Sequence, residues 1–268
     1  MNRIVQRFQD LAARKQAAFI PYITAGDPNL AQTEQLVYAL EEAGADVLEL
    51  GVPFSDPVGD GPVIQVAAQR ALAGGTTPND VLALVSKVRQ KSELPILLFT
   101  YFNPVFVHGI DNFARDAAAA GADGVLCVDL PPEEAEEYKH ALDKNGLCSV
   151  FLVAPTTSDK RLAHIASLCT GFVYYVSRLG VTGEQSSLAT DLSAAVQRIK
   201  RFTDKPVAVG FGVSKPEQAR EVADLAEGVV VGSAIVRLIG ELGDQPETPE
   251  KVRQFAAALA QATKSTAG

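Results

Sequence analysis

The stretch LELGVPFSDPVGDGPVIQ, residues 48–65, carries two carboxylates, Glu49 and Asp60, on either side of a loop that contains Asp56. Glu49 stands inside an apolar run, whereas Asp60 follows eleven residues later between two glycines. Burial disfavours the charged form of a carboxyl group and raises its pKa, which suits a general acid or base that works near neutral pH. A structural glutamate would instead pair with an inward Lys or Arg, and no predicted strand core contains one. We therefore predict that Glu49 is a catalytic acid–base residue.

Asp60 alone indicates a catalytic role less strongly than Glu49 does, because an Asp beside a glycine is commonly a turn residue. Its loop directly follows the strand that carries Glu49, so both groups are expected at the same rim of the fold. We predict that Asp60 is the second catalytic carboxylate and that its environment differs from that of Glu49, since one lies on a loop and the other at a strand end.

Short apolar runs rich in β-branched residues recur along the chain, and each is followed by a segment with helical periodicity. These runs are residues 17–23, 45–50, 95–101, 123–129, 147–153, 171–177, 205–210 and 227–232. Eight such units without a break in composition predict one α/β domain over residues 1–268, a (β/α)8 TIM barrel of roughly 250 residues. The amphipathic residues 1–16 predict an extra N-terminal helix that packs against it. A doubly wound sheet is the alternative, but residues 22–29 lack the G-x-G-x-x-G spacing.

The direction of Glu49 follows from strand alternation. Glu49 shares one face with Val47, while Leu48 and Leu50 share the other. We expect Leu48 and Leu50 to pack beneath outer helices, which leaves Glu49 directed into the barrel. In this fold the active site lies at the carboxyl ends of the strands, which is where Glu49 is placed.

Capping patterns mark two helix N-termini. Thr77 precedes Pro78, which fits a helix whose first residue is proline. Ser214 is followed three residues later by Glu217, the pattern of a capping box. We expect helices to begin directly after Thr77 and after Ser214.

The late loops are rich in glycine: residues 180–183, 210–212 and 232–233 each follow a predicted strand. In such barrels the loops after strands seven and eight, with the N-terminus of a short helix, often hold a phosphate group. Glycines let backbone N–H groups approach an anion, and the helix end adds a favourable dipole. Ser233 would offer a hydroxyl at the start of that helix. We therefore predict a phosphorylated substrate that is held mainly by backbone amides.

The bulk composition excludes several classes of protein. The 268 residues carry a net charge of −8 and are 47% hydrophobic, which argues against a polyanion partner and against disorder. We find no long apolar run and no targeting segment, so we expect a cytoplasmic protein. Cys127, Cys148 and Cys169 are widely spaced and have no histidine at ligand spacing. We expect them to be core thiols, with no metal site and no Cys or His nucleophile.

The chain resembles the alpha subunit family of tryptophan synthase nearly end to end. The matching stretches are residues 19–28, 48–65, 100–106, 124–134, 174–183, 209–218 and 229–236. The resemblance implies a lyase without a cofactor, which cleaves indole-3-glycerol phosphate into indole and glyceraldehyde 3-phosphate by a retro-aldol reaction. It also implies a partner, a pyridoxal-phosphate beta subunit that receives the indole for L-tryptophan synthesis within an αββα heterotetramer.

The resemblance implies roles for individual residues. Glu49 matches the family's acid–base residue, and Asp60 matches the carboxylate that faces the indole N–H. Tyr174 matches an active-site tyrosine, although alternation allows either Tyr174 or Tyr175, but not both, to face inward. The other implied substrate-binding positions lie in late loops: Thr182, Gly183, Phe211, Gly212, Gly232 and Ser233.

The resemblance places the contact with the beta subunit at Asp56 and Pro57, and a mobile lid at residues 177–187. Other functions remain open. A stand-alone indole-3-glycerol-phosphate lyase would run the same reaction without a partner and release free indole. A non-catalytic subunit that only activates a partner would not need both Glu49 and Asp60. A phosphosugar isomerase on the same barrel would need a base and an electrophile of its own, and no Lys or His is suitably placed.

Overall fold

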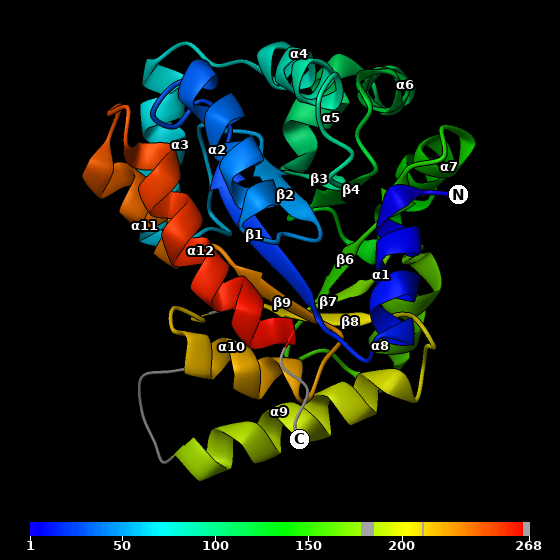
Figure 1. Cartoon of the computed structure of the whole chain (residues 1–268). Coiled ribbons are helices and arrows are strands. Elements are labelled where there is room, and N and C mark those ends of the chain that lie inside the picture. Colours follow the sequence, from blue (N-terminus) through cyan, green and yellow to red (C-terminus); the bar gives the residue numbers. More distant parts are fainter. Residues whose placement is uncertain (178–184, 211, 265–268) are drawn as a thin grey trace.

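The computed structural model describes residues 1–177, 185–210 and 212–264, and for residues 185–190 it describes the backbone only. Within these residues nine strands form one parallel sheet in the order β5-β4-β3-β2-β1-β9-β8-β7-β6, with helices around it (Figure 1). The strands are β1 (Ala18–Thr24), β2 (Leu48–Gly51), β3 (Ile96–Thr100), β4 (Gly124–Cys127), β5 (Cys148–Ser149), β6 (Phe151–Val153), β7 (Val173–Val176), β8 (Val207–Gly210) and β9 (Gly228–Val231). The two ends of this order, β5 and β6, are separated in the sequence by Val150 alone, so the sheet curls into a barrel.

Helices follow the strands and cover the outside of the barrel. They are α1 (Arg3–Ala13), α2 (Leu30–Glu42), α3 (Pro62–Ala73), α4 (Pro78–Arg89), α5 (Phe102–His108), α6 (Ile110–Ala120), the 3₁₀ turn η1 (Pro132–Glu134), α7 (Glu136–Lys144), α8 (Asp159–Leu168), α9 (Gln185–Lys200), α10 (Pro216–Ala223), α11 (Ser233–Leu242) and α12 (Thr248–Lys264). The last helix, α12, packs against both α2 and α10 (Figure 1). The prediction of a (β/α)8 TIM barrel with an extra N-terminal helix is confirmed.

The two ends of the sheet meet in the segment that was predicted as the fifth strand, and the barrel closes there. Residues 147–153, expected as a single strand, form β5 and β6 on either side of Val150. β5 pairs with β4 and β6 pairs with β7, while the Val150 N–H donates to the Val125 carbonyl. The Ser149 carbonyl accepts the N–H of Thr170, shortly before β7. The fifth of the eight predicted strands is therefore divided, because its two halves pair with different neighbours.

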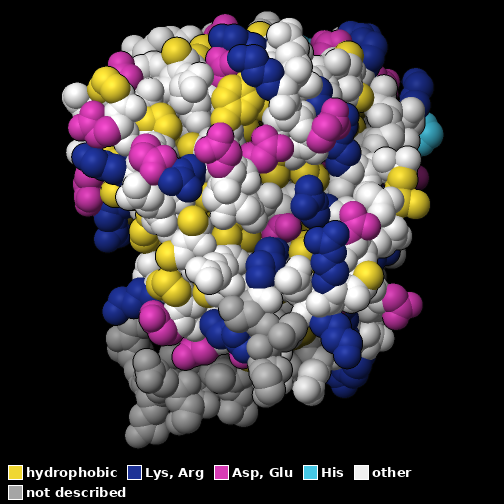
Figure 2. Space-filling model, viewed as in Figure 1, with side chains coloured by type: hydrophobic (Ala, Val, Ile, Leu, Met, Phe, Trp, Pro, Cys, Tyr) yellow, Lys and Arg dark blue, Asp and Glu magenta, His cyan; other side chains and the backbone are white. Residues whose placement is uncertain are grey.

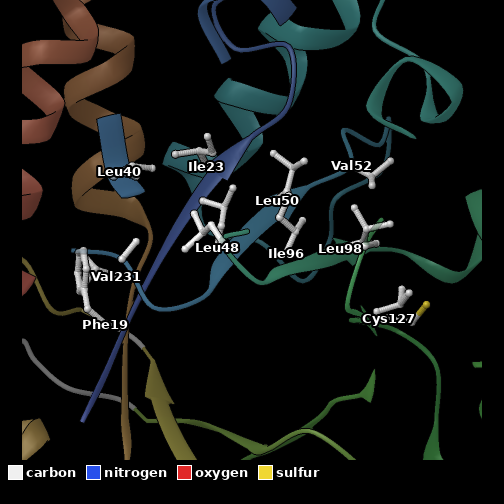
Figure 3. Close-up of a cluster of buried hydrophobic side chains, with 14 of the residues drawn as sticks. Phe19, Ile23, Leu40, Leu48, Leu50, Val52, Ile96, Leu98, Cys127 and Val231 are labelled. Carbon is white, nitrogen blue, oxygen red and sulfur yellow. The ribbon is translucent and has the colours of Figure 1, made fainter. Parts of the chain in front are cut away.

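Alternation along the strands produces two apolar layers. Outward side chains pack against the helices in the larger layer, which includes Leu48, Leu50 and Ile96 (Figure 3). Inward side chains, among them Val47 and Leu97, form a second cluster inside the barrel. The predicted faces of β2 are thus confirmed, with the leucines outside and Val47 inside.

Helix α1 closes the amino-terminal end of the barrel. Its apolar face adds Ile4, Phe8 and Leu11 to the inner cluster. The ring of Phe8 lies 5.4 Å from that of Phe172, which directly precedes β7. Since this end is filled by side chains, the open end of the barrel is the carboxyl end of the strands, where Glu49 lies.

One predicted helix cap is confirmed and the other is wrong by one residue. The Thr77 hydroxyl accepts the N–H of Asp80, whose carboxylate accepts the N–H of Thr77 in return. At α10, Gln218 and not Glu217 accepts the N–H of Ser214. The helix begins one residue later than the pattern indicated, so the third helical position falls on Gln218.

The surface carries both charge signs. Lys and Arg are interspersed with Asp and Glu on the face shown in Figure 2. Cys127, Cys148 and Cys169 are buried and unpaired, as predicted for core thiols. None of the helices that the structure describes is long and apolar enough to cross a membrane.

Candidate active site

Glu49 lies on β2 with its side chain inside the barrel. It is 1% exposed, and its Oε1 atom has no hydrogen-bond partner among the described residues. Its neighbours in register, Tyr22 on β1 and Leu97 on β3, carry no charge. Burial raises the pKa of Glu49 well above its ordinary value, and no cation in the described part of the chain opposes this effect. The inward carboxyl group therefore favours its protonated form.

Inward side chains at and above the level of Glu49 form a wall that is mainly apolar and aromatic. These side chains are Tyr22, Phe99, Val128, Leu152 and Tyr174. The rings of Tyr22 and Phe99 meet edge-on, with centroids 5.2 Å apart. Of this wall, the sequence analysis singled out only Tyr174. The other positions could have been found by applying period-two alternation to every strand, as was done for β2.

Tyr174, and not Tyr175, faces the interior. Tyr174 packs against the inner cluster, whereas Tyr175 belongs to the outer one. The Tyr174 hydroxyl lies against Gly210 on β8, where an added Cβ would be 2.3 Å from the oxygen. Burial raises the pKa of Tyr174 well above its ordinary value, and the charge of Glu49 adds to the effect. The side chains of Tyr174 and Glu49 thus both face the interior of the barrel.

Asp60 lies in the loop between β2 and α3 and is held there by Tyr101. The Tyr101 hydroxyl accepts the N–H of Gly59 at 2.9 Å and hydrogen-bonds the Asp60 carboxylate. The ring of Tyr101 stacks on Phe54 with centroids 5.1 Å apart. Burial raises the pKa of Asp60 to about 6, while the bond with Tyr101 opposes this shift. With a pKa of about 6, Asp60 favours its ionised form at neutral pH.

The two predicted carboxylates lie near the same two tyrosines, Tyr22 and Tyr174. The charges of Asp60 and Glu49 both raise the pKa of Tyr22, and both raise that of Tyr174, although burial is the largest cause in each case. The structure therefore brings Glu49 and Asp60 together, as the order of strand and loop predicted. A carboxyl group with a pKa raised well above its ordinary value and a second one with a pKa of about 6, both beside an aromatic wall, can together donate a proton and stabilise a positive charge.

Backbone N–H groups collect at the ends of β8 and β9. Helix α11 begins at Ser233 directly after β9, with Gly232 as its N-cap and no acidic side chain in its first turn. Gly212, beyond the end of β8, has a φ of +80°, a conformation that favours glycine. Gly212, Gly232 and Ser233 lie at the same end of the barrel as Glu49, where a helix N-terminus suits an anion. Three further predicted positions lie outside the described residues: Thr182, Gly183 and Phe211.

Exposed apolar side chains lie close to the loop that carries Asp60. Val58 is 85% exposed, and Phe106 and Val107, at the end of α5, are 64% and 77% exposed. Asp56 is exposed and Pro57 is half-buried on the same loop as Val58. This loop and α5 follow the neighbouring strands β2 and β3. Exposed large apolar groups at adjacent loops are typical of a surface that binds another protein.

Two of the three histidines, His108 and His164, have partners away from Glu49 and Asp60. His108 Nε2 lies 2.8 Å from the Asp116 carboxylate, and His164 Nε2 lies 3.1 Å from the Pro132 carbonyl. Over residues 1–177, 185–210 and 212–264, no three His, Cys, Asp or Glu side chains are grouped so that they could hold a metal ion.

Comparisons with known proteins give a consistent result. The family model described as "Tryptophan synthase alpha chain" matches residues 8–266. The tryptophan synthase alpha chain of Geotalea uraniireducens is 50% identical over 269 residues, with 100% of both chains covered. That of Geotalea daltonii is 54% identical over 237 residues, covering 88% of this chain and 90% of the relative.

Solved structures agree with the sequence comparisons. Tryptophan synthase subunit alpha from Legionella pneumophila has a TM-score of 0.90 to this chain at 41% identity, with 98% of each chain covered. A chain of tryptophan synthase from Mycobacterium tuberculosis has a TM-score of 0.89 at 38% identity, with 99% of each covered. The similarity therefore extends over nearly the whole length of the chain.

Proposed function

Because the chain belongs to the tryptophan synthase alpha chain family, we propose that Glu49 and Asp60 catalyse its alpha reaction. This lyase reaction cleaves indole-3-glycerol phosphate into indole and glyceraldehyde 3-phosphate, on the route to L-tryptophan. One observation supports the assignment above the others: the inward carboxyl group of Glu49 is fully buried without a cation among the described residues. Such an arrangement costs free energy, and perturbed acids of this kind cluster at functional sites.

Glu49 begins the reaction as a general acid. Its protonated form, favoured by burial, gives a proton to C3 of the indole ring. Protonation at C3 breaks the conjugation of the ring and places positive charge on the indole nitrogen. Asp60, which is ionised above about pH 6, faces that nitrogen and stabilises the charge as it grows. This interaction is stronger in the transition state than in the bound substrate, so it accelerates the reaction.

Glu49 then acts as the base. Its carboxylate takes the proton from the hydroxyl on the glycerol carbon that is bonded to C3. The carbon–carbon bond breaks, its electron pair neutralises the indole nitrogen, and the oxygen becomes the aldehyde oxygen of glyceraldehyde 3-phosphate. One proton has entered at C3 and one has left the hydroxyl, so Glu49 ends as it began. A positioned acid–base group contributes roughly 10²–10⁴-fold, and positioning and electrostatics supply the rest.

The remaining groups hold the substrate in place. The wall of Tyr22, Phe99, Val128, Leu152 and Tyr174 offers the apolar and aromatic contact that an indole ring requires. The phosphate binds at the carboxyl ends of β8 and β9, where the N–H groups of α11 are directed at it. The residues that we assign to this end are Thr182, Gly183, Phe211, Gly212, Gly232 and Ser233.

Membership of the family implies a beta-subunit partner. We propose that it contacts Asp56 and Pro57, and that the exposed Val58, Phe106 and Val107 add apolar area to this contact. The docking surface would then adjoin the mouth of the site, so that indole passes directly to the partner within an αββα heterotetramer. We further propose that residues 1–268 form one barrel domain and that the enzyme works in the cytoplasm.

The test is the release of glyceraldehyde 3-phosphate from indole-3-glycerol phosphate by the purified chain, with and without a tryptophan synthase beta subunit. We expect slow turnover by the chain alone and strong acceleration when the beta subunit is added. Fast turnover that ignores the beta subunit would instead indicate a stand-alone lyase. No turnover under either condition would contradict the roles of Glu49 and Asp60.

A further inference from the structure

Tyr22 places a hydroxyl group at the catalytic end of the barrel. It is the residue of β1 in register with Glu49, and its side chain is 5% exposed. Its hydroxyl lies against Gly51, two residues beyond Glu49 on β2, where an added Cβ would be 2.2 Å from the phenol oxygen. Only glycine at this position leaves room for the ring, so the hydroxyl can reach the rim on the same side as Glu49.

Tyr174 repeats this arrangement elsewhere in the barrel. It is in register with Ala208 on β8, and its hydroxyl lies against Gly210, two residues further along that strand. In both cases an inward tyrosine leans over the inward glycine of the next strand, towards the carboxyl end. Two phenol groups are thus placed at the site by the same geometry, and the mechanism above uses only their rings.

The phenol of Tyr22 is suited to donate a hydrogen bond at the catalytic end of the barrel. Among the described residues its hydroxyl has one partner, the Oγ1 atom of Thr24 at 3.3 Å. When the Thr24 hydroxyl donates to the phenol oxygen, the phenol proton is left for another acceptor. Burial, and then the charges of Asp60 and Glu49, raise the pKa of Tyr22 well above its ordinary value. The phenol therefore keeps its proton while the carboxylates change theirs.

We propose that Tyr22 is a further catalytic residue, whose O–H donates to the substrate oxygen that becomes the aldehyde oxygen of glyceraldehyde 3-phosphate. The proposal rests on the proposed function, because that oxygen is the one from which Glu49 removes a proton. Side chains in register on adjacent strands lie close together, so Tyr22 and Glu49 can reach the same substrate atom.

The Tyr22 O–H stabilises negative charge that develops on the substrate oxygen during the second step, in which Glu49 acts as the base. The O–H bond of the substrate breaks, its proton passes to Glu49, and the oxygen carries extra electron density until the carbon–carbon bond breaks and the carbonyl forms. A hydrogen bond that is already in place stabilises this density without reorganisation. Tyr22 itself neither gains nor loses a proton over the cycle.

The variant Tyr22→Phe tests this role, since it keeps the ring against Phe99 and Gly51 and removes only the oxygen. We expect kcat for glyceraldehyde 3-phosphate release to fall about 3- to 10-fold, the range for loss of one neutral hydrogen bond. Affinity for an analogue in which an unsubstituted propyl chain joins indole to phosphate should stay unchanged in calorimetry, because this analogue lacks the oxygen. Tyr175→Phe, which removes a hydroxyl from the outward neighbour of Tyr174, should leave both quantities unchanged.

Two outcomes would overturn the proposal. One is a wild-type kcat in Tyr22→Phe. The other is a loss of analogue affinity equal to the loss in kcat, which would show that Tyr22 only packs against the indole ring. If Tyr22→Phe does not fold, Thr24→Val decides by the same criteria, because it removes the group that orients the phenol. Failure of the proposed function would look different, since the wild-type chain itself would then release no aldehyde.

Discussion

Buried carboxylates lie at both ends of the barrel, and those at the amino-terminal end are fully engaged. Asp123, directly before β4, is 3% exposed and accepts the N–H of Ile96 at 2.9 Å. Arg3 and Arg89 pair with its two oxygens at 3.1 and 3.2 Å. Asp46, before β2, is held in the same way by a backbone N–H and a lysine. These acids connect helix and strand at the closed end of the barrel.

Glu49, at the open end, is buried as deeply but has none of these partners. Burial raises the pKa of Asp123 as well, yet the N–H of Ile96 and two arginines oppose that effect. For Glu49 nothing in the described part of the chain opposes it. A paired buried acid contributes to the structure, whereas an unpaired one is retained at a cost in stability and is available for chemistry. Within this fold, lack of a partner identifies the catalytic acid better than burial does.

Glu49→Gln should have the largest effect on activity. We expect turnover to fall by roughly 10²–10⁴-fold, because an amide cannot transfer the proton to C3. The free energy of unfolding should stay the same or rise, since an unpaired acid is replaced by a neutral group of the same shape. Aldehyde release and urea denaturation measure the two quantities. Near-wild-type rates would show that the acid–base assignment is wrong.

Asp123→Asn should show the opposite pattern. Removing one partner from a buried ion pair costs about 3–5 kcal/mol. The side-chain amide of the introduced Asn keeps part of the hydrogen bonding. We therefore expect the free energy of unfolding to fall by about 2–4 kcal/mol. The kcat should stay within about 2-fold of wild type, because the change lies at the far end of the barrel. Urea denaturation and aldehyde release test both expectations.

The matched control is Glu93→Gln. Glu93 pairs with the same Arg3 but is exposed, so its loss should leave stability unchanged. If Asp123→Asn were as stable as Glu93→Gln, the distinction between engaged and unpaired buried acids would fail.

Asp60 should set the acid limb of the pH profile. Its pKa is raised to about 6, and its ionised form is the one that stabilises the indole nitrogen, so activity is lost as pH falls through that value. We expect kcat/KM to fall about tenfold per pH unit below this point. On the alkaline side, ionisation of Glu49 removes the proton donor and limits the rate.

The control for this profile is Asp60→Asn, which should lower the plateau and abolish the acid limb. An acid limb that persists unchanged in Asp60→Asn would belong to another group, and Asp60 would then lose its assigned role.

The direction of Glu49 could be predicted from the sequence because alternation within one strand is a local property. Its proximity to Asp60 could be predicted for a similar reason, since a parallel strand and the loop that follows it share one end of the barrel. Most side chains of the apolar and aromatic wall around Glu49 were not predicted from the sequence. Tyr22 and Phe99 lie on β1 and β3, whereas alternation was used above only for β2 and for the pair Tyr174 and Tyr175.

Contacts between segments that are distant in the sequence could not be predicted. Tyr101, which directly follows β3, holds the loop of Asp60, and no local pattern indicates that contact. The division of the fifth strand at Val150 depends on which neighbours its two halves meet, and this is decided only when the barrel closes. The hydroxyl of Tyr22 likewise acquires its position from Gly51 on the next strand.

The protonation state of Glu49 in the substrate-free protein is the most direct test of the difference between the two ends. Infrared difference spectra between wild type and Glu49→Gln at neutral pH would measure it. We expect a protonated carboxyl band in the wild type that disappears in Glu49→Gln. Loss of a carboxylate band instead would show that Glu49 is ionised at neutral pH. Burial without a cation would then not be what prepares it to protonate the substrate.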